Sequence, residues 1–498
     1  MDYKNLKSGT DVRGVASDIF GKDITLTEEA VRDITAGFVK FLEEKLNKNA
    51  ENLRVAVGHD SRITADLIKG NVIDVLSKMG VKVYDCGLSS TPAMFMATVK
   101  TDADGSVQIT ASHHPADRNG LKFFTEDGGL DSSDISKIIE IANNFTLTDK
   151  KQGEVVKLDF MSEYAKILRN IICSALDKTE ADKPLSKFHI VVDAGNGAGG
   201  FYASEVLSRL GANTTGSVYL NPDGMFPNHI PNPEDKDAMA SIQKAVLSSN
   251  ADLGVIFDTD VDRAGCVDSS GNEINRNRLI ALSAAIVMDD NPHATIVTDS
   301  VTSSGLKEFI ERDLGGKHHR FKRGYKNVIN EAIRLCSQGI NSPLAIETSG
   351  HAALKENYFL DDGAYLITKI IIKMAKLSDE GKTIDDLIAT LKMPKEADEL
   401  RFAINTEDFR AYGENVINEL EKFFESSPEW IIADDNREGI RASYKDGWVL
   451  LRLSVHDPIM PMNLESDTIG GVKEMLSVMR PFFERFDKLD ITPFDSRI

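Results

Sequence analysis

The 498-residue sequence has few cysteines, prolines and tryptophans, with 4, 15 and 2 residues respectively. The cysteines show neither a CxxC motif nor any other paired spacing of a zinc site. This usage excludes a disulfide-stapled secreted scaffold, and we expect free thiols in a reducing cytoplasm. The low proline content and the ordinary glycine content also exclude collagen-like and low-complexity proteins.

Long hydrophobic runs are absent as well. The longest, around residues 279–288, is shorter than the roughly 20 residues that a helix needs to cross a bilayer. The first ten residues contain no apolar segment, so we expect no signal peptide.

Basic residues are fewer than acidic ones, 58 against 78, which gives a net charge of -20. Because an acidic surface repels nucleic acid and anionic lipid, we expect neither as a partner. A phosphorylated substrate would need a locally basic pocket.

What the sequence does contain is a repeated α/β unit. Three segments, beginning at Leu53, Phe188 and Ala294, run from an apolar β-rich stretch through a Gly/Asp/Ser turn into a helix-period segment. Strands that alternate with amphipathic helices indicate mostly parallel or mixed sheets covered by helices. Residues 411–455 instead combine one amphipathic helix with strand-like runs.

We therefore predict an α/β fold with three related mixed-sheet domains and a smaller C-terminal α+β domain. The expected domains are residues 1–155, 156–280, 281–395 and 396–498. Residues 177–186 and 392–399 have the composition of linkers. Ligands of α/β sheets bind beyond the carboxyl ends of the strands, so the loops there are the places to look for chemistry.

The first such loop, TASHHP, places Ser112 before His113 and His114. A serine beside imidazoles is a candidate nucleophile or phosphate carrier. The alternative is a polar turn with surface histidines. No GxSxG motif surrounds Ser112, which disfavours an α/β-hydrolase.

The second loop, DTDVDR, follows the strand-like LGVIF and carries Asp258, Asp260 and Asp262 at alternate positions. Three carboxylates this close repel one another unless a cation joins them, and oxygen ligands suit Mg²⁺. An EF-hand would need glycine and glutamate where Arg263 and Ser269 stand, so that motif is excluded.

Two later loops carry residues that suit the binding of a sugar and a phosphate. ETSGH supplies Glu347, Ser349 and His351, which suit hydrogen bonds to sugar hydroxyls, and His351 can also move a proton. RLSVHDP supplies Arg452 and Ser454, and an arginine at a strand end can bind a phosphate dianion. Taken alone, each is as well explained by an exposed turn.

One motif matches the dinucleotide-binding fingerprint in its glycine spacing alone. Gly195, Gly197 and Gly200 satisfy GxGxxG, but no acidic residue closes the next strand-like run, as a ribose contact requires. We interpret these glycines as a tight strand-to-helix turn.

Taken together and in this order, the four loops resemble those of the α-D-phosphohexomutase family, which includes phosphoglucomutases and phosphomannomutases. Further motifs add to the resemblance over nearly the whole chain. They are SGTDVRG with Arg13, NGLK with Lys122, FPNHIPNPED at residues 226–235, and RGYK with Lys326.

The resemblance implies four domains around a central cleft and a mutase that interconverts hexose 1-phosphate and hexose 6-phosphate through a 1,6-bisphosphate. Ser112 would be the phosphoserine, and with Asp258, Asp260 and Asp262 it would hold Mg²⁺.

The remaining roles also follow from the resemblance. Arg13, Lys122, Arg263 and His351 would serve catalysis by offsetting charge or moving protons. The substrate would be bound by Arg13, His113, Lys326, Glu347, Ser349, His351, Arg452, Ser454 and His456. Small-molecule sugar phosphates would be the partners, with a catalytic hexose 1,6-bisphosphate as activator, in a cytoplasmic monomer or homodimer.

Two loops depart from the family pattern. His114 replaces asparagine in the usual SHNP, and Val455, His456 and Asp457 replace Gly, Thr and Glu of the usual RPSGTEP. Valine adds a Cβ where backbone amides should approach a phosphate, so the preferred sugar stays open. The E-x-S-G-H form of the sugar loop also occurs in phosphoglucosamine mutases. Two alternative functions are considered. One is a sugar-bisphosphate synthase or phosphatase, and the other is a non-catalytic regulator that binds sugar phosphate.

Overall fold

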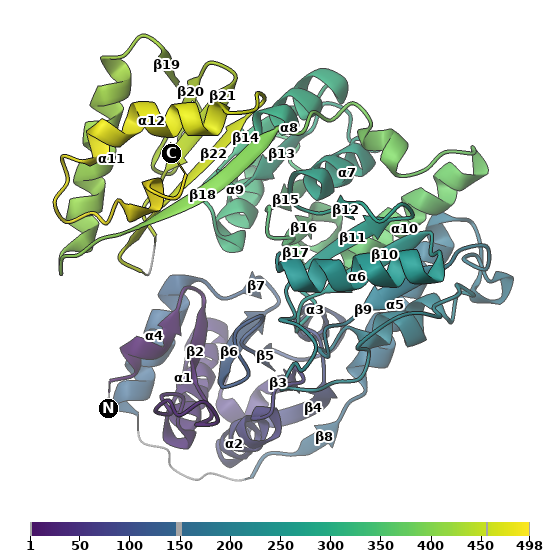
Figure 1. The fold of residues 1–498 in the computed structure, drawn as a ribbon. Helices are drawn as coiled ribbons and strands as arrows, with labels where there is room; N and C mark the ends of the chain where they lie inside the picture. The colour runs from purple at the N-terminus through teal and green to yellow at the C-terminus, as the bar shows by residue number, and fades with distance from the viewer. Residues whose placement is uncertain (1, 146–151, 455–456, 498) are drawn as a thin grey trace. The chain divides into compact units, whose positions relative to one another are not determined.

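The computed structural model describes residues 2–145, 152–454 and 457–497 (Figure 1). The chain divides into two compact units. Unit 1 comprises residues 1–286 and 349–387, and unit 2 comprises residues 287–348 and 388–498. The boundaries of the four domains expected from the sequence stay a prediction.

Unit 1 begins with a mixed sheet whose central strands are mostly buried. In spatial order its strands are β1 (Lys7–Ser8), β2 (Asp11–Val15), β6 (Arg118–Thr125), β5 (Gly105–Ile109), β3 (Arg54–His59), β4 (Lys82–Leu88) and β8 (Val155–Lys157), and β7 (Gly128–Gly129) pairs with β6. β3 runs parallel to β4 and β5, whereas β6 runs antiparallel to β5. The loop between β5 and β6 therefore leaves and re-enters the sheet at one edge, and it carries Ser112.

Helices cover both faces of this sheet. One core unites the sheet with α1 (Glu28–Leu46), α2 (Ala65–Lys78) and α4 (Ser132–Asn144). Val55 and Val57 of β3 point into that core, as the two-residue period of a strand requires. α3 (Thr91–Lys100) contacts β3, β5 and β6 and packs against α5 (Phe160–Ala175). Ser90 caps α3 by accepting a hydrogen bond from the Ala93 amide, and Pro92 lies in its first turn.

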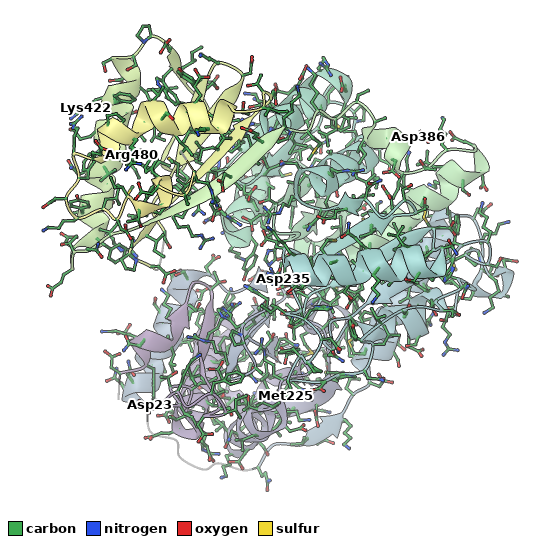
Figure 2. The ribbon with its side chains drawn as sticks, viewed as in Figure 1. Asp23, Met225, Asp235, Asp386, Lys422 and Arg480 are labelled. Carbon is green, nitrogen blue, oxygen red and sulfur yellow. The ribbon has the colours of Figure 1, made fainter. Side chains whose placement is uncertain are left out.

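The second sheet of unit 1 has four strands in the order β12 (Glu273–Ile274), β11 (Ala264–Asp268), β10 (Leu253–Phe257) and β9 (Ile190–Asp193). β9 and β10 are parallel, and β10 and β11 form an antiparallel hairpin. α6 (Lys236–Ser249) packs on β9 and β10, and its N-terminus is capped by Asp235 (Figure 2). The expected helix after the glycine turn is a π-helix at Tyr202–Leu207.

Unit 1 also contains the antiparallel pair β16 (Ala352–Leu354) and β17 (Leu360–Asp361), followed by α10 (Gly363–Asp379). α7 (Arg276–Met288) begins in unit 1 and ends at the start of unit 2.

Unit 2 combines a parallel α/β layer with an antiparallel sheet. β13 (Thr295–Thr298) pairs in parallel with β14 (Lys317–Arg320) and β15 (Leu344–Ile346). The helices of this part are α8 (Ser304–Glu308), a π-helix at Phe309–Asp313, and α9 (Tyr325–Ser337).

The C-terminal part of unit 2 is an antiparallel sheet with helices packed on it. The strands, in order, are β18 (Glu396–Ala403), β22 (Ile459–Ser466), β21 (Gly447–Leu451), β20 (Ile440–Tyr444) and β19 (Trp430–Ile432). α11 (Phe409–Glu425) and α12 (Gly471–Phe483) close an aromatic core in which Phe402 stacks on Phe483 and Phe494.

These observations confirm the predicted fold class of α/β domains with mixed sheets and a C-terminal domain of sheet and helices. One linker assignment is wrong, because Glu396–Glu399 belong to β18 and pair with β22. Polar residues alternate there along an edge strand, and this low apolar content gave the segment its linker-like composition. In the described part of the chain, no helix is long and apolar enough to cross a membrane.

Candidate active site

The loop between β5 and β6 holds Ser112 in an unusual backbone conformation. Ser112 has a φ of 51°, in the left-handed region that non-glycine residues seldom adopt. Its amide donates a hydrogen bond to the Thr110 hydroxyl at 2.9 Å, and the residue is buried. Such backbone strain persists only where the surroundings impose it, and it is commonest at functional sites.

The Ser112 hydroxyl lies between groups of opposite charge. Its Oγ donates a hydrogen bond to Asp258 Oδ2 at 2.9 Å and accepts one from Arg263 Nη2 at 3.1 Å. His113 Nδ1 lies 3.3 Å from the same oxygen and 2.6 Å from Arg263 Nη2. The hydroxyl is therefore placed where a carboxylate and a guanidinium meet.

The three aspartates of DTDVDR form the turn between β10 and β11. Asp258, Asp260 and Asp262 are buried, and their carboxylate oxygens lie within 4.8 Å of one another. Val261 adopts a φ of 67°, which tightens the turn and places the alternate side chains together. Burial and the two neighbouring carboxylates hold the pKa of Asp258 well above its usual range.

The oxygen atoms of this cluster fit a hard divalent cation. Asp260 Oδ1 and Asp262 Oδ1 are buried and have no hydrogen-bond partner among the described residues. Buried carboxylate oxygens are costly without a partner, and a cation such as Mg²⁺ takes oxygen ligands. The residues present therefore fit the metal site that their spacing predicts.

Two side chains from the first sheet and its helix hold the aspartate turn. Lys122 on β6 donates to Asp260 Oδ2 at 3.0 Å and to Asp262 Oδ2 at 2.5 Å. Thr91, at the start of α3, donates its hydroxyl to Asp260 Oδ2 and its amide to the Asp260 carbonyl. Because Lys122 and Arg263 are close, the pKa of the Asp262 carboxyl is lowered although burial opposes this.

The segment Ser349–His351 reaches the same place. Residues 263 and 351 form an antiparallel bridge, and Ala264 donates its amide to the Gly350 carbonyl at 3.4 Å. A Cβ on Gly350, whose φ is 90°, would lie 2.6 Å from the Ala264 carbonyl oxygen, so glycine is needed here. Ser349 Oγ and His351 Nδ1 are 2.9 Å apart, and His351 Nε2 lies 3.7 Å from Asp262 Oδ1.

The imidazoles of this site are held neutral. Burial, and then the positive charge of Arg263, lower the pKa of His113 to about 2 and that of His351 well below its usual range. Burial and then Arg13 lower the pKa of His114 to about 3. Arg13 on β2 donates to Asp11 at 2.7 Å, and its charge also acts on His113 and His351.

The structure thus brings together in unit 1 the residues that the sequence singled out there. They are Arg13, Ser112, His113, Lys122, Asp258, Asp260, Asp262, Arg263, Ser349 and His351.

The remaining predicted residues lie in unit 2. Glu347, after β15, accepts a hydrogen bond from the Gly324 amide at 2.6 Å, and Lys326 lies in the first turn of α9. Arg452 is buried after β21, and its Nε has no hydrogen-bond partner among the described residues. Burial, and then the charge of Arg323, lower the pKa of Arg452.

The loop after Arg452 is described only in part. Ser454 donates its amide to the Ile459 carbonyl at 2.9 Å, and its Oγ accepts from the Asp457 amide at 3.3 Å. His456, and Val455 beside it, lie outside the described residues.

The glycine-rich turn after β9 is structural, as the sequence predicted. A Cβ on Gly197 would lie 2.5 Å from the carbonyl oxygen of Thr259, between Asp258 and Asp260. The Ala198 amide donates to that same carbonyl at 2.8 Å. This glycine lets the turn pack directly against the aspartate loop.

Four contributors to the site were missed from the sequence. Thr91 and Asn232 are two of them, and Asn232 accepts from Arg263 Nη1 at 3.0 Å. The other two, Asp60 and Arg62, follow β3 and contact the serine loop. The only sequence signal for Asp60 and Arg62 was their position in a loop after a strand.

Protein-family models match most of the chain. Models of phosphoglucomutase/phosphomannomutase α/β/α domains I, II and III match residues 5–149, 162–271 and 275–393 in that order.

Individual relatives cover nearly the whole chain. A phosphomannomutase/phosphoglucomutase of Pseudomonas syringae pv. tomato is 30% identical over 470 residues, which is 94% of this chain and 92% of the relative. A phosphoglucomutase of Neisseria gonorrhoeae is 28% identical and covers 95% of both chains. A crystal structure of a phosphoglucomutase/phosphomannomutase family protein from Burkholderia thailandensis is similar in fold, with a TM-score of 0.77, 24% identity and coverage of 97% of this chain and 98% of that one.

Proposed function

Because the chain belongs to the phosphoglucomutase/phosphomannomutase family, we propose that it interconverts hexose 1-phosphate and hexose 6-phosphate, with glucose or mannose as the sugar. The observation that carries the proposal is the position of the Ser112 hydroxyl against Asp258 and Arg263. A phosphate carrier needs positive charge around its phosphoryl group, and Arg263 supplies it at 3.1 Å.

Ser112 acts in this proposal as the phosphoserine of the working enzyme. The sugar hydroxyl attacks the phosphorus, a new sugar O–P bond forms, and the Ser112 Oγ–P bond breaks to give a bound 1,6-bisphosphate. The bisphosphate then returns its other phosphoryl group to Ser112, so that phosphate is conserved over the cycle.

Asp258, Asp260 and Asp262 would hold Mg²⁺ together with an oxygen of phospho-Ser112. When bound, Mg²⁺ supplies neutralisation of the charge that spreads over the transferring phosphoryl group. Lys122 donates to the carboxylates of Asp260 and Asp262, and its charge contributes to the lowered pKa of Asp262.

The proton of the attacking hydroxyl needs an acceptor, and His351 suits this role. Its imidazole is neutral and can take up a proton, although burial and Arg263 lower its pKa and so weaken it as a base. Lys122 would supply the proton of the reverse transfer, although its ion pairs with Asp260 and Asp262 stabilise the ammonium form. Arg13 and His113 would complete the lining of the reacting centre.

The residues that read the sugar and its second phosphate are assigned by family pattern and by their present environment. Glu347, Ser349 and His351 would accept or donate hydrogen bonds to the sugar hydroxyls. Arg452 would bind the distal phosphate, with Ser454, Lys326 and His456 as further donors. The buried Arg452 Nε without a described partner supports this assignment.

A catalytic amount of hexose 1,6-bisphosphate would activate the enzyme by phosphorylating Ser112. The sugar phosphate is the partner that this chemistry requires. We also propose a cytoplasmic location, which the four free cysteines support. The proposed assembly is a monomer or a homodimer.

A ³¹P NMR time course tests the proposal. Glucose 1-phosphate, mannose 1-phosphate and glucosamine 1-phosphate are supplied separately with Mg²⁺ and a trace of glucose 1,6-bisphosphate. We expect a 6-phosphate resonance to grow from the glucose or the mannose ester. No conversion of any of the three by Ser112-phosphorylated protein would overturn the proposal.

The same spectra separate the mutase from a sugar-bisphosphate synthase. The substitutions at Val455, His456 and Asp457 favour this second candidate, because a weaker phosphate loop would release the bisphosphate before it turns over. With phospho-Ser112 protein supplied in an amount comparable with the hexose 1-phosphate, release of one bisphosphate for each phosphoserine consumed, without a 6-phosphate resonance, would identify the synthase.

A further inference from the structure

The side chain of Arg62 donates hydrogen bonds to four backbone carbonyls of the serine loop, and it also lies against the Asp60 carboxylate and the Phe226 ring. Nη2 donates to the carbonyl oxygens of Ser112 and His114, both at 2.5 Å. Nη1 donates to those of Pro115 and Arg118 at 2.7 and 2.8 Å. Both terminal nitrogens are thus used, and the four carbonyls span the whole turn from the serine to the start of β6.

A second set of contacts joins Arg62 to the other side of Ser112. Nε of Arg62 lies 3.3 Å from Asp60 Oδ2. That same oxygen accepts a hydrogen bond from the Thr110 hydroxyl at 2.6 Å, and Thr110 Oγ1 accepts from the Ser112 amide at 2.9 Å. The serine is therefore held at its carbonyl by Arg62 directly, and at its amide through Asp60 and Thr110.

These contacts stabilise an unfavourable backbone conformation, because Ser112 adopts a φ of 51°. A serine leaves that conformation unless its neighbours impose it. In this conformation the Oγ reaches Asp258 and Arg263. Rotating the backbone to an ordinary φ would swing the hydroxyl away from both.

Only arginine can make this arrangement. The guanidinium is a rigid planar fork with five N–H donors, whereas a lysine ammonium presents three donors from one point. Arg62 and Asp60 are both buried, so their charges face each other with little screening by water. Burial lowers the pKa of Arg62, and the Asp60 carboxylate opposes that shift, so the guanidinium stays charged.

We infer that Arg62 is a positioning residue for phosphoryl transfer, which holds Ser112 in its left-handed conformation so that Oγ meets Asp258 and Arg263. It touches neither substrate nor the reacting atoms and acts through the serine loop. This inference rests on the proposed function of Ser112 as phosphate carrier.

Four proteins test it, namely wild type, Arg62→Ala, Arg62→Lys and the control Arg169→Ala. Arg169 is a buried arginine of α5 that donates to the Glu180 carboxylate and to the Glu205 carbonyl, far in sequence from the serine loop. Turnover of glucose 1-phosphate is measured with and without millimolar guanidinium, at concentrations well below those that unfold the protein.

For Arg62→Ala we expect kcat to fall by about 10²-fold, the cost of misplacing a reacting group, with KM close to wild type. Guanidinium should restore kcat, because it can enter the cavity left by the side chain and donate to the same carbonyls. Arg62→Lys should lose kcat and gain nothing from guanidinium, since the lysine fills the cavity. Arg169→Ala should retain the wild-type kcat.

Hydrogen exchange of residues 111–118 gives a readout that does not depend on turnover. In Arg62→Ala these amides should exchange faster, and guanidinium should slow them again, whereas Arg169→Ala should leave them unchanged. If Arg62→Ala fails to fold, Arg62→Lys carries the test through kcat, KM and exchange.

The inference is overturned if kcat and hydrogen exchange in the Arg62 variants match those of wild type. It is also overturned if the activity lost in Arg62→Ala is proportional to the loss of folded protein and guanidinium does not restore it. A different result would overturn the proposed function instead. In that case the wild type would turn over no glucose 1-phosphate, while the amides of residues 111–118 would still exchange faster in Arg62→Ala and slow again with guanidinium. The role of Arg62 in holding the serine loop would then stand.

Discussion

The hydroxyl of Ser112 donates a hydrogen bond of 2.9 Å to the carboxylate of Asp258, across 146 residues of sequence. This bond joins the loop after β5 to the turn after β10, so the first and second sheets of unit 1 share one reactive group. Arg263 contacts both partners, at 3.1 Å from the serine oxygen and 3.2 Å from Asp258 Oδ2. A phosphoryl group on Ser112 would replace the hydroxyl proton and bring negative charge, which the guanidinium and a bound cation would offset.

Replacing Ser112 by alanine should remove both turnover and the covalent phosphoryl group. We expect a loss of about 10⁴–10⁶-fold in kcat, the range for deleting a nucleophile. Intact mass after exposure to glucose 1,6-bisphosphate should rise by about 80 Da in wild type and stay unchanged in Ser112→Ala. Ser106→Ala is the control, because Ser106 on β5 is also buried but donates only to the Met94 carbonyl. A mass increase in Ser112→Ala would show that another residue carries the phosphate.

Asp260→Asn should weaken Mg²⁺ binding, because it removes one of the three clustered carboxylates. At about 100 times the dissociation constant, Mg²⁺ should stabilise wild type by about 2.7 kcal/mol. Most of that gain should vanish in Asp260→Asn, as measured by thermal unfolding with Mg²⁺ and with a chelator. Asp85→Asn on β4, where the carboxylate accepts from the Gly87 amide, should keep the full Mg²⁺ effect. Equal stabilisation of wild type and Asp260→Asn would rule out this aspartate as a ligand.

Gly197→Ala should damage the metal site without touching any of its side chains. The added Cβ would lie 2.5 Å from the Thr259 carbonyl oxygen, so the aspartate turn must shift. We expect a loss of about 1–3 kcal/mol in the free energy of unfolding, together with weaker Mg²⁺ binding.

Gly70→Ala is the matched control for this substitution. Gly70 is exposed within α2, and a Cβ there meets no atom within 4 Å. It should stabilise the protein by about 0.5–1 kcal/mol, because alanine favours the helix. Destabilisation of Gly70→Ala equal to that of Gly197→Ala would show that the measured loss does not come from the contact with Thr259.

Glu465 on β22 should make the stability of the protein fall as the pH rises. Burial raises its pKa from 4.5 to about 7, although Trp448 Nε1 donates to its carboxylate at 2.8 Å. Between these two values the unfolded chain ionises Glu465 while the folded protein keeps it protonated, so folding loses free energy with increasing pH. Glu465→Gln cannot ionise and should be more stable than wild type by up to about 3 kcal/mol near pH 8, with no difference near pH 4.

Denaturant unfolding at both pH values checks the sign, and Glu396→Gln provides the opposite case. The amides of Gly470 and Val472 donate to Glu396 and lower its pKa, so its ionised form stabilises the fold above the usual pKa of a glutamate. Glu396→Gln should therefore be less stable than wild type near pH 8. If the two substitutions changed stability in the same direction, burial would not be the cause of the Glu465 effect.

Much of the fold was predictable because its strands and helices follow simple periods. The run LGVIF became β10 without a change of boundary, and the three aspartates after it became a buried cluster. The edge strand β18 was missed in part, because polar residues interrupt its apolar positions and its partner residues in β22 lie 56 to 70 positions later in the chain.

The side chains that support the site were less predictable than those that form it. Thr91 and Arg62 act through backbone carbonyls and a distant carboxylate, and such partners leave no pattern of residue types in the sequence. Nor does the sequence contain the left-handed φ of Ser112, because that conformation belongs to glycine or asparagine by propensity and is imposed here by tertiary contacts.

Every contact of Arg62 with the serine loop lies within residues 60–118, whereas Asp258 follows much later in the chain. During synthesis, all of the residues that contact Arg62 in the serine loop leave the ribosome long before the aspartate turn has been made. Ser112 can thus acquire its conformation on a nascent chain, and the three aspartates then assemble next to a serine that is already in place.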